Sequence, residues 1–224
     1  RDAEEIHDEA TADQKAHQNR DHVDAGHAEL LEAALALFAE KGFAAAKLDE
    51  IAARAGVSKG ALYLYFETKQ DLFGAVVREA VAPNLDMVEA ALAQATLPFP
   101  DLLRLLFARI GQVITTSRLG SVAKLVIGES RNFPELARVW HDEVVSRALT
   151  AVSAAIRRGQ ERGEVRPGDP RLHGFSIVGP LLTGVIWRET FTPVGAPAVD
   201  LEALIAQHAD TVLLGLAPRP EDRS

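Results

Sequence analysis

Residues 58–65 combine one lysine, a serine hydroxyl and two tyrosine hydroxyls with small and apolar neighbours, a set of groups that can contact a polyanion. The ammonium and the hydroxyls can bind phosphate oxygens, and the small residues allow the backbone to approach a groove closely. A pair of tyrosines on its own is more often half-buried packing, so the assignment depends on the elements that hold this segment. The residues expected to face outward are Ser58, Lys59, Gly60, Ala61, Tyr63 and Leu64, with Tyr65 at the edge.

Two short helices joined by a tight turn are predicted to hold these side chains. Residues 48–55 have the apolar spacing of an amphipathic helix. Gly56 follows at the point where the chain must leave that helix, which favours a residue that tolerates positive φ. Ser58 can cap the next helix with its hydroxyl, and Leu62 and Phe66, four residues apart, can face one core. This pattern is typical of a DNA-binding helix-turn-helix.

The wider sequence resembles the DNA-binding domain of the TetR family of transcriptional regulators over about residues 27 to 80. The matching stretches are residues 31–43, Ile51-Ala52, residues 55–66, Lys69 and Leu72-Phe73. The resemblance implies a three-helix N-terminal domain that places its third helix in the major groove of DNA. It also implies that the rest of the chain is a helical domain for ligand binding and dimerisation.

The resemblance assigns individual positions to the DNA interface. Lys47 stands where the family usually has a threonine that touches phosphate, so it can supply a charge there but no capping hydroxyl. Leu64 stands where relatives often carry a polar or aromatic residue, so no base contact is expected from it. The other positions that the resemblance places at the DNA are Ser58, Lys59, Ala61, Tyr63, Tyr65 and Lys69.

The charge of the chain opposes this assignment in part. The formal net charge is −8, and acidic residues outnumber basic ones in the first 26 residues, where relatives often carry a basic arm. Cations make the phosphate contacts that dominate affinity for nucleic acid. Charge acts locally, however, within about 8–10 Å at moderate salt, and helix N-termini also attract phosphate. Lys47, Lys59 and Lys69 lie at or next to predicted helix starts, where they can still meet phosphate. Because the basic arm is missing, we expect either modest DNA affinity with a shallow salt dependence or a long first helix that is kept away from phosphate.

Other functions find little support in the sequence. The chain has no cysteine, which excludes disulfides, thiolate metal sites and cysteine nucleophiles. The charge-free run over residues 175–187 is shorter than the ~20 residues that span a bilayer, so no membrane partner is expected. No catalytic constellation or phosphate loop is evident, so the chain is not expected to be an enzyme. His141, His173 and His208 have no partner at i, i+4, so neither a metal site nor a cofactor is expected.

The sequence beyond residue 67 predicts a succession of helices and therefore an all-α chain. Proline and glycine mark the expected helix ends, and no strand alternation or internal repeat occurs. The predicted helices cover residues 68–94 with a kink at Pro83, 101–117, 119–131, 134–162, 171–191 and 199–216, with loops at 97–100 and 167–170.

The last two predicted helices are strongly apolar for surface elements, so their apolar side chains must be buried against other helices. Within the resemblance they correspond to the pair that packs against its twofold mate, which predicts a homodimer held by a four-helix bundle. Packing within a monomer core is the alternative. A symmetric dimer would present two recognition helices to a palindromic operator.

Residues 125–136 also resemble the C-terminal domain of AefR-type members of the family.

A small-molecule site is expected among the middle helices, lined by apolar residues with a few polar anchors. Each candidate alone is more often packing than a ligand contact, because any bundle core needs large residues. The candidates are Phe107, Ile110, Ile127, Glu129, Trp140, His141, Phe175 and Trp187.

The sequence therefore predicts a cytoplasmic, homodimeric repressor that binds a palindromic double-stranded DNA operator and is released by a small-molecule inducer. The expected parts are an acidic extension (residues 1–26), a helix-turn-helix domain (27–74), a ligand-binding and dimerisation domain (75–217) and a tail (218–224). Two alternatives stay open. One is a ligand- or partner-binding relative with weak DNA affinity, and the other is an enzyme on a helical scaffold.

Overall fold

The computed structural model describes residues 26–94, 96–116 and 119–220, and every regular element in these ranges is a helix. The all-α prediction is therefore confirmed for the described residues. The chain divides into two compact units between Val76 and Val77, whereas the sequence placed a boundary after residue 74. Residues 1–25 and 221–224, which hold most of the predicted acidic extension and tail, lie outside the described residues.

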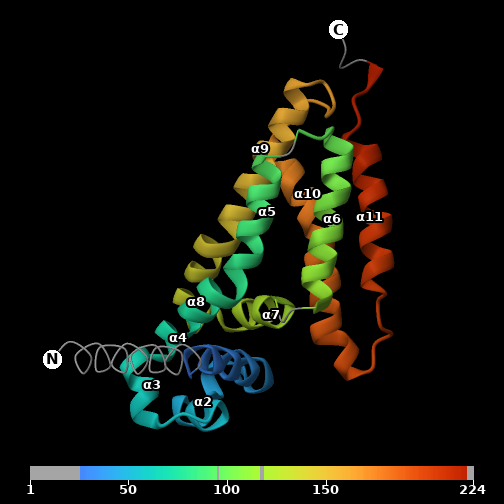
Figure 1. Cartoon of the computed structure of the whole chain (residues 1–224). Coiled ribbons are helices and arrows are strands. Elements are labelled where there is room, and N and C mark those ends of the chain that lie inside the picture. The colour runs from blue at the N-terminus through green and yellow to red at the C-terminus, as the bar shows by residue number, and fades with distance from the viewer. Residues whose placement is uncertain (1–25, 95, 117–118, 221–224) are drawn as a thin grey trace, which may run out of the picture. The chain divides into compact units, whose positions relative to one another are not determined.

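The described part of the N-terminal unit folds into a first helix and three shorter helices (Figure 1). The backbone is helical over residues 26–45, and the helices that follow are α2 (Leu48–Ala55), α3 (Lys59–Tyr65) and α4 (Lys69–Ala75). Thr68 caps α4 by accepting a hydrogen bond from the N–H of Asp71, whose carboxylate accepts from the N–H of Thr68 in return. This reciprocal cap fixes where α4 begins.

Three phenylalanine rings form the centre of this unit. The ring centroids of Phe38 and Phe43 are 5.2 Å apart, and those of Phe43 and Phe73 are 6.0 Å apart. All three side chains are buried, as are Ile51 of α2 and Leu62 of α3. Because this core contains side chains from all four helical segments, it fixes their positions relative to one another.

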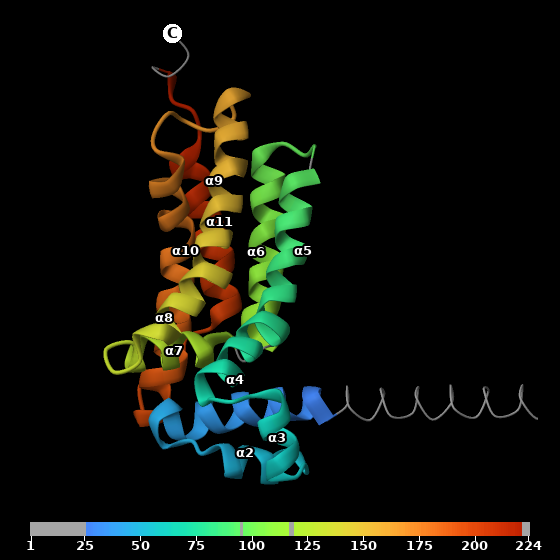
Figure 2. The same ribbon diagram turned by 90° about the vertical axis from the view of Figure 1, so that its left-hand side faces the viewer.

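The C-terminal unit is a bundle of roughly parallel and antiparallel helices (Figure 2). Its elements are η1 (Val76–Val81), α5 (Ala82–Gln94), α6 (Phe99–Thr116), α7 (Leu119–Glu129), α8 (Pro134–Trp140), η2 (His141–Val145), α9 (Ser146–Glu161), α10 (Pro170–Ile186), η3 (Trp187–Phe191), η4 (Thr192–Val194) and α11 (Leu201–Leu216). Helix α10 packs against α9 and α11, α11 packs against α6, and α5 lies along both α6 and α9. Helix α7 lies across one end of the bundle.

The core of the bundle is apolar, with Phe107, Ile156 and Ile177 among its most deeply buried side chains. Helices α10 and α11 approach closely at Gly184, where an added Cβ would lie 2.6 Å from the Cδ2 atom of Leu204. The inner faces of the last two helices are thus used within one chain, and only their outer faces are available to a partner.

Turns of π-helix interrupt three helices that the sequence predicted to be longer or continuous. In the predicted helix over 68–94, the wide turn of η1 comes just before Pro83. Proline lacks the N–H, and in a regular helix its ring would clash with the carbonyl four residues before it, so a wider turn relieves both problems. The predicted helix over 134–162 is divided by η2, and α10 ends in η3 instead of continuing to residue 191 as an α-helix.

Two predicted helix starts are wrong by two residues. Helix α6 begins at Phe99, not at residue 101, because the N–H of Phe99 donates to the Glu164 carboxylate at 2.8 Å and the buried ring anchors the first turn. Helix α11 begins at Leu201, not at residue 199, because Asp200 caps it by accepting from the N–H of Ala203 at 3.0 Å.

A charged cluster joins α5 to α9. The guanidinium of Arg147 donates to both carboxylate oxygens of Glu89, at 3.1 and 2.6 Å, and also to the carboxylate of Asp86. Hydrogen bonds to Glu89 and Asp86 raise the pKa of Arg147, so this cation stays charged at any pH at which the protein is folded. Both acidic side chains of α5 are therefore directed toward α9.

Candidate nucleic-acid interface and ligand site

The turn between α2 and α3 has the predicted geometry. Gly56 adopts φ 73°, and its N–H donates to the carbonyls of Ala52 and Ala53, closing the end of α2. The hydroxyl of Ser58 accepts from the N–H of Ala61 at 3.1 Å and caps α3. The predicted turn and the predicted cap are both confirmed.

Helix α3 divides into a buried and an exposed face. Leu62 is fully buried and Phe66, which ends the helix, is 5 % exposed, as the spacing predicted. On the other side, Tyr63 is 44 % exposed and Leu64 is 87 % exposed. Tyr65 lies at the edge, where its ring packs edge-on against His27 at 5.4 Å. The exposed face thus presents a phenol and an aliphatic side chain next to the small residues of the first turn.

Lys59 lies at the first position of α3 and forms an ion pair with Asp49 of α2. The distance from Nζ to Oδ2 is 2.8 Å, and the ammonium also lies 5.9 Å from the centroid of the Tyr63 ring. The hydrogen bond to Asp49 raises the pKa of Lys59. Both members of the pair are largely exposed, so the lysine can exchange the carboxylate for a phosphate.

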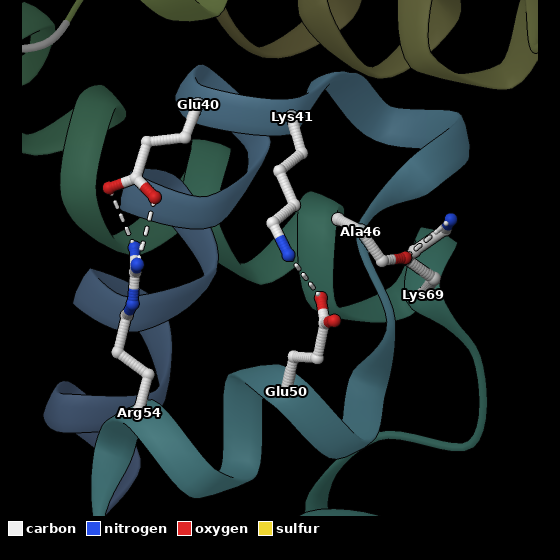
Figure 3. Close-up of polar contacts among 6 residues, drawn as sticks. All are labelled: Glu40, Lys41, Ala46, Glu50, Arg54 and Lys69. Atoms are coloured by element: carbon white, nitrogen blue, oxygen red, sulfur yellow. Dashed lines mark hydrogen bonds and ion pairs between the residues drawn. The ribbon is translucent and has the colours of Figure 1, made fainter.

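Lys69, which the sequence analysis expects at the DNA, binds backbone carbonyls of the N-terminal unit in this structure. Its Nζ donates to the carbonyls of Phe43 and Ala44, at 3.1 Å for Ala44. It also donates to the carbonyl of Ala46 at 2.9 Å (Figure 3). The same ammonium lies 4.6 Å from the centroid of the Phe43 ring. Three carbonyl acceptors match the three donors of an ammonium group, so this lysine binds the end of the first helix and the residue that follows it.

Ion pairs fix α2 against the first helix. The Arg54 guanidinium donates to both oxygens of Glu40 at 2.8 Å, and Lys41 pairs with Glu50 at 3.1 Å (Figure 3). Lys47 precedes α2, is exposed and makes no side-chain cap, as expected for a lysine at that position. Its ammonium is therefore placed on the surface beside the helix-turn-helix.

The predicted ligand residues do not converge on one cavity. Phe107 is core packing, with its ring edge-on to His208 at 5.4 Å, and Trp187 donates from Nε1 to the carbonyl of Pro197 at 2.9 Å. Phe175 and Ile127 are 51 % and 55 % exposed. Spacing alone could not tell an inward from an outward face.

The other predicted ligand residues are scattered in the same way. Ile110, Glu129 and Trp140 are partly buried, on three different helices. His141 is exposed and bonded to Asp142 at 2.7 Å. Of the eight candidates, only His141 borders one of the grooves described next.

Three surface grooves are described in the bundle instead. One lies between α5 and α6, with a volume of about 280 Å³, and a second lies between α5 and α9, with a volume of about 330 Å³. The third, of about 340 Å³, lies between α9 and the start of α10 and contains His141, Arg157, Asp169 and Arg171. These volumes are at the lower end of those of small-molecule sites.

Metal and membrane sites find no support among the described residues. No group of three or more histidine, aspartate or glutamate side chains is arranged to hold a metal ion there. No helix in the described ranges is long and apolar enough to cross a membrane.

A helix-turn-helix with an exposed second helix, followed by an all-helical domain, is the architecture of a helix-turn-helix transcriptional regulator. Residues 30–76 match the family described as bacterial regulatory proteins, tetR family, and residues 100–207 match the tetracyclin repressor-like C-terminal domain. The chain belongs to the TetR family. Members of this family regulate transcription and are not enzymes, which removes the enzyme alternative.

The chain is similar to several transcriptional regulators. It is 31% identical over 153 residues to the HTH-type transcriptional repressor SCO4008 of Streptomyces coelicolor, covering 64% of this chain and 69% of that protein. A solved TetR-family regulator from Mesorhizobium loti superimposes with a TM-score of 0.69 at 28% identity, over 86% of this chain and 95% of that one. The SmeT–triclosan complex, from a Stenotrophomonas maltophilia repressor, gives a TM-score of 0.69 at 26% identity, over 86% and 92% of the two chains.

Proposed function

We propose that this chain is a homodimeric, cytoplasmic repressor that binds a palindromic operator and leaves it when a small molecule binds the C-terminal bundle. The observation that carries the proposal is the exposed face of α3, positioned by the Gly56 turn and the Ser58 cap. Tyr63 and Lys59 would contact the DNA there, with Lys47 beside the helix. The similarity of residues 125–136 to AefR-type members supports placing the chain in that subgroup.

Homodimer formation is supported by the outer faces of α10 and α11. Leu172, Phe175 and Leu182 are 64 %, 51 % and 40 % exposed on α10, and Leu214 of α11 is 81 % exposed. They recur at helical spacing on the side opposite the bundle core, which is the pattern of a face that another chain covers. Phe175 is therefore proposed as an interface residue instead of a ligand contact.

The dimer can be tested by sedimentation velocity on Phe175→Glu and Leu182→Glu variants. We expect both to shift the protein to monomers while helicity is kept, because a charge in an apolar interface has no partner. Ile127→Glu, at an equally exposed position on α7, is the matched control and should stay dimeric. Dimers in all three variants would place the interface elsewhere.

Operator binding can be tested by selecting bound DNA from a random pool at about 100 mM salt, because phosphate contacts weaken steeply above that range. Enriched inverted repeats with half-sites about one helical turn apart would support the proposal. Lys59→Ala and Tyr63→Ala should then lower operator affinity. Unchanged affinity in both variants would contradict the placement of α3 in the groove.

A second candidate function is that of a ligand- or partner-binding relative with weak DNA affinity. It is favoured by the two lysines whose charges are already used, Lys59 by Asp49 and Lys69 by backbone carbonyls. A folded dimer that enriches no DNA sequence in the selection would support this alternative and contradict the repressor.

A further inference from the structure

The groove between α5 and α6 combines an apolar surface with one arginine that has no carboxylate partner. Met87 of α5 and Leu105 of α6 are 66 % and 41 % exposed along it, and Leu102 and Leu106 form its buried wall. Two apolar side chains left open to water on facing helices would be stabilised by an apolar occupant.

Arg109 supplies the charge of this groove. Its only hydrogen bond to another side chain is from Nη1 to Oε1 of Gln112 at 3.3 Å, and it forms no ion pair within the described ranges. On the same helix, Arg104 already pairs with Asp101 at 3.3 Å. An exposed guanidinium with a fork of free donors favours a planar anion such as a carboxylate.

The acidic residues of α5 do not neutralise Arg109. Asp86 and Glu89, the two carboxylates of that helix, are both bonded to Arg147 of α9, on the opposite side of α5. The α5–α6 groove therefore keeps a local positive charge although the whole chain is acidic.

The other two grooves lack this combination. In the α5–α9 groove, Arg147 is held by two carboxylates and Arg158 donates to the carbonyl of Leu92 at 2.6 Å. The groove between α9 and α10 places Asp169 next to Arg171, so its charges are mixed. Of these three grooves, the α5–α6 groove is the one that combines an arginine and an apolar wall with a lining that contains no carboxylate.

We propose that the α5–α6 groove binds an amphipathic monoanion, a carboxylate on an unbranched apolar chain, with the carboxylate at Arg109 and the chain directed toward Leu102. The inference rests on the proposed function, because it names the ligand class of the same bundle. At 1.5 Å per residue, the path from Arg109 to Leu102 is about 10 Å long. The volume of about 280 Å³ holds roughly nine non-hydrogen atoms at ~30 Å³ each.

The test uses octanoate, whose size matches this volume, and 1-octanol, which has the same chain without the charge. Isothermal titration of the full chain without DNA should show saturable octanoate binding, with octanol weaker by about tenfold because an exposed charge-assisted contact is lost. Arg109→Gln should weaken octanoate by about tenfold and leave octanol unchanged. Arg104→Gln, on the same helix but already paired, should leave both unchanged.

Met87→Asp provides a second variant, and since this side chain is mostly exposed, the fold should tolerate the change. It should weaken the binding of both compounds. No saturable octanoate binding, equal affinities for octanoate and octanol, or unchanged binding in Arg109→Gln would each overturn the inference.

The same preparation should be used in the DNA selection, so that the two proposals fail separately. Operator enrichment without octanoate binding would overturn the ligand inference and leave the repressor in place. Octanoate binding without any DNA enrichment would support the groove and contradict the repressor.

Discussion

Asp49→Asn is expected to strengthen DNA binding, because Asp49 holds the Lys59 ammonium in the free protein. The two side chains are 57 % and 62 % exposed and 2.8 Å apart. Lys59 must leave this carboxylate before it can contact a phosphate, so removing the carboxylate removes that cost. Since exposed ion pairs are weak, we expect a gain in affinity of about 1.4-fold to fivefold per half-site.

The assay is fluorescence anisotropy with a labelled duplex, and it needs no knowledge of the operator because phosphate contacts are independent of sequence. Lys59→Ala should weaken binding and reduce the slope of log affinity against log salt by about 0.9 per half-site. Glu32→Gln, which removes the same charge from the first helix, is the control for net charge.

A double-mutant cycle decides whether Asp49 acts through Lys59. If it does, Asp49→Asn in the Lys59→Ala background should have little effect on affinity. An equal gain in both backgrounds would mean that Asp49 repels phosphate directly. No gain in either background would refute the reasoning and imply that Lys59 stays with Asp49 on DNA.

Three further changes have defined expectations. Lys69→Met should lower the free energy of unfolding by about 1–3 kcal/mol, because carbonyls of Phe43, Ala44 and Ala46 lose their shared donor, whereas Lys47→Met should change it by less than about 0.5 kcal/mol in urea titrations; equal effects would contradict the internal role of Lys69. Gly56→Ala should cost about 1–2 kcal/mol by the same measurement, since φ is 73° and the new Cβ would meet no atom within 4 Å, so that the cost comes from the backbone alone; a neutral result would show that the turn adopts another conformation. The Glu164 carboxylate has a lowered pKa because it accepts from Arg162 and from the N–H of Phe99, so its stabilisation is present above the unfolded-state pKa and is lost as the pH falls through the lowered folded-state pKa. Glu164→Gln should therefore reduce stability at neutral pH and flatten its decline in acid, and an unchanged acid limb would argue against this cap.

The helix-turn-helix could be predicted because its determinants are local. Gly56, Ser58, Leu62 and Phe66 act within about one turn of their own positions, where spacing and conformational preference are enough. The role of Lys69 could not be predicted in the same way. Its three acceptors lie 23 to 26 residues earlier in the chain, and a lysine next to a helix start gives no sign of them.

The scatter of the predicted ligand residues over the bundle has a related reason. Helical spacing identifies one apolar face, but α10 has two, one buried around Ile177 and one exposed around Phe175. The sequence analysis also did not single out Arg109, which we propose as a ligand contact. Its case depends on Asp86 and Glu89 of α5 both binding Arg147, a contact that the sequence does not reveal. The π-helical turn at His141–Val145 has neither proline nor glycine within it, so the sequence carried no mark of that break.

The ammonium of Lys69 has a mechanical consequence for signalling. It joins the first residue of α4 to the end of the first helix, and the three phenylalanine rings join the same helices from inside. Because Leu62 of α3 is buried in the same unit, turning α3 alone would have to break its packing against these helices. If the proposed dimer and effector exist, a bound effector would change the distance between half-sites that fits the dimer and would leave unchanged the bases that each half recognises.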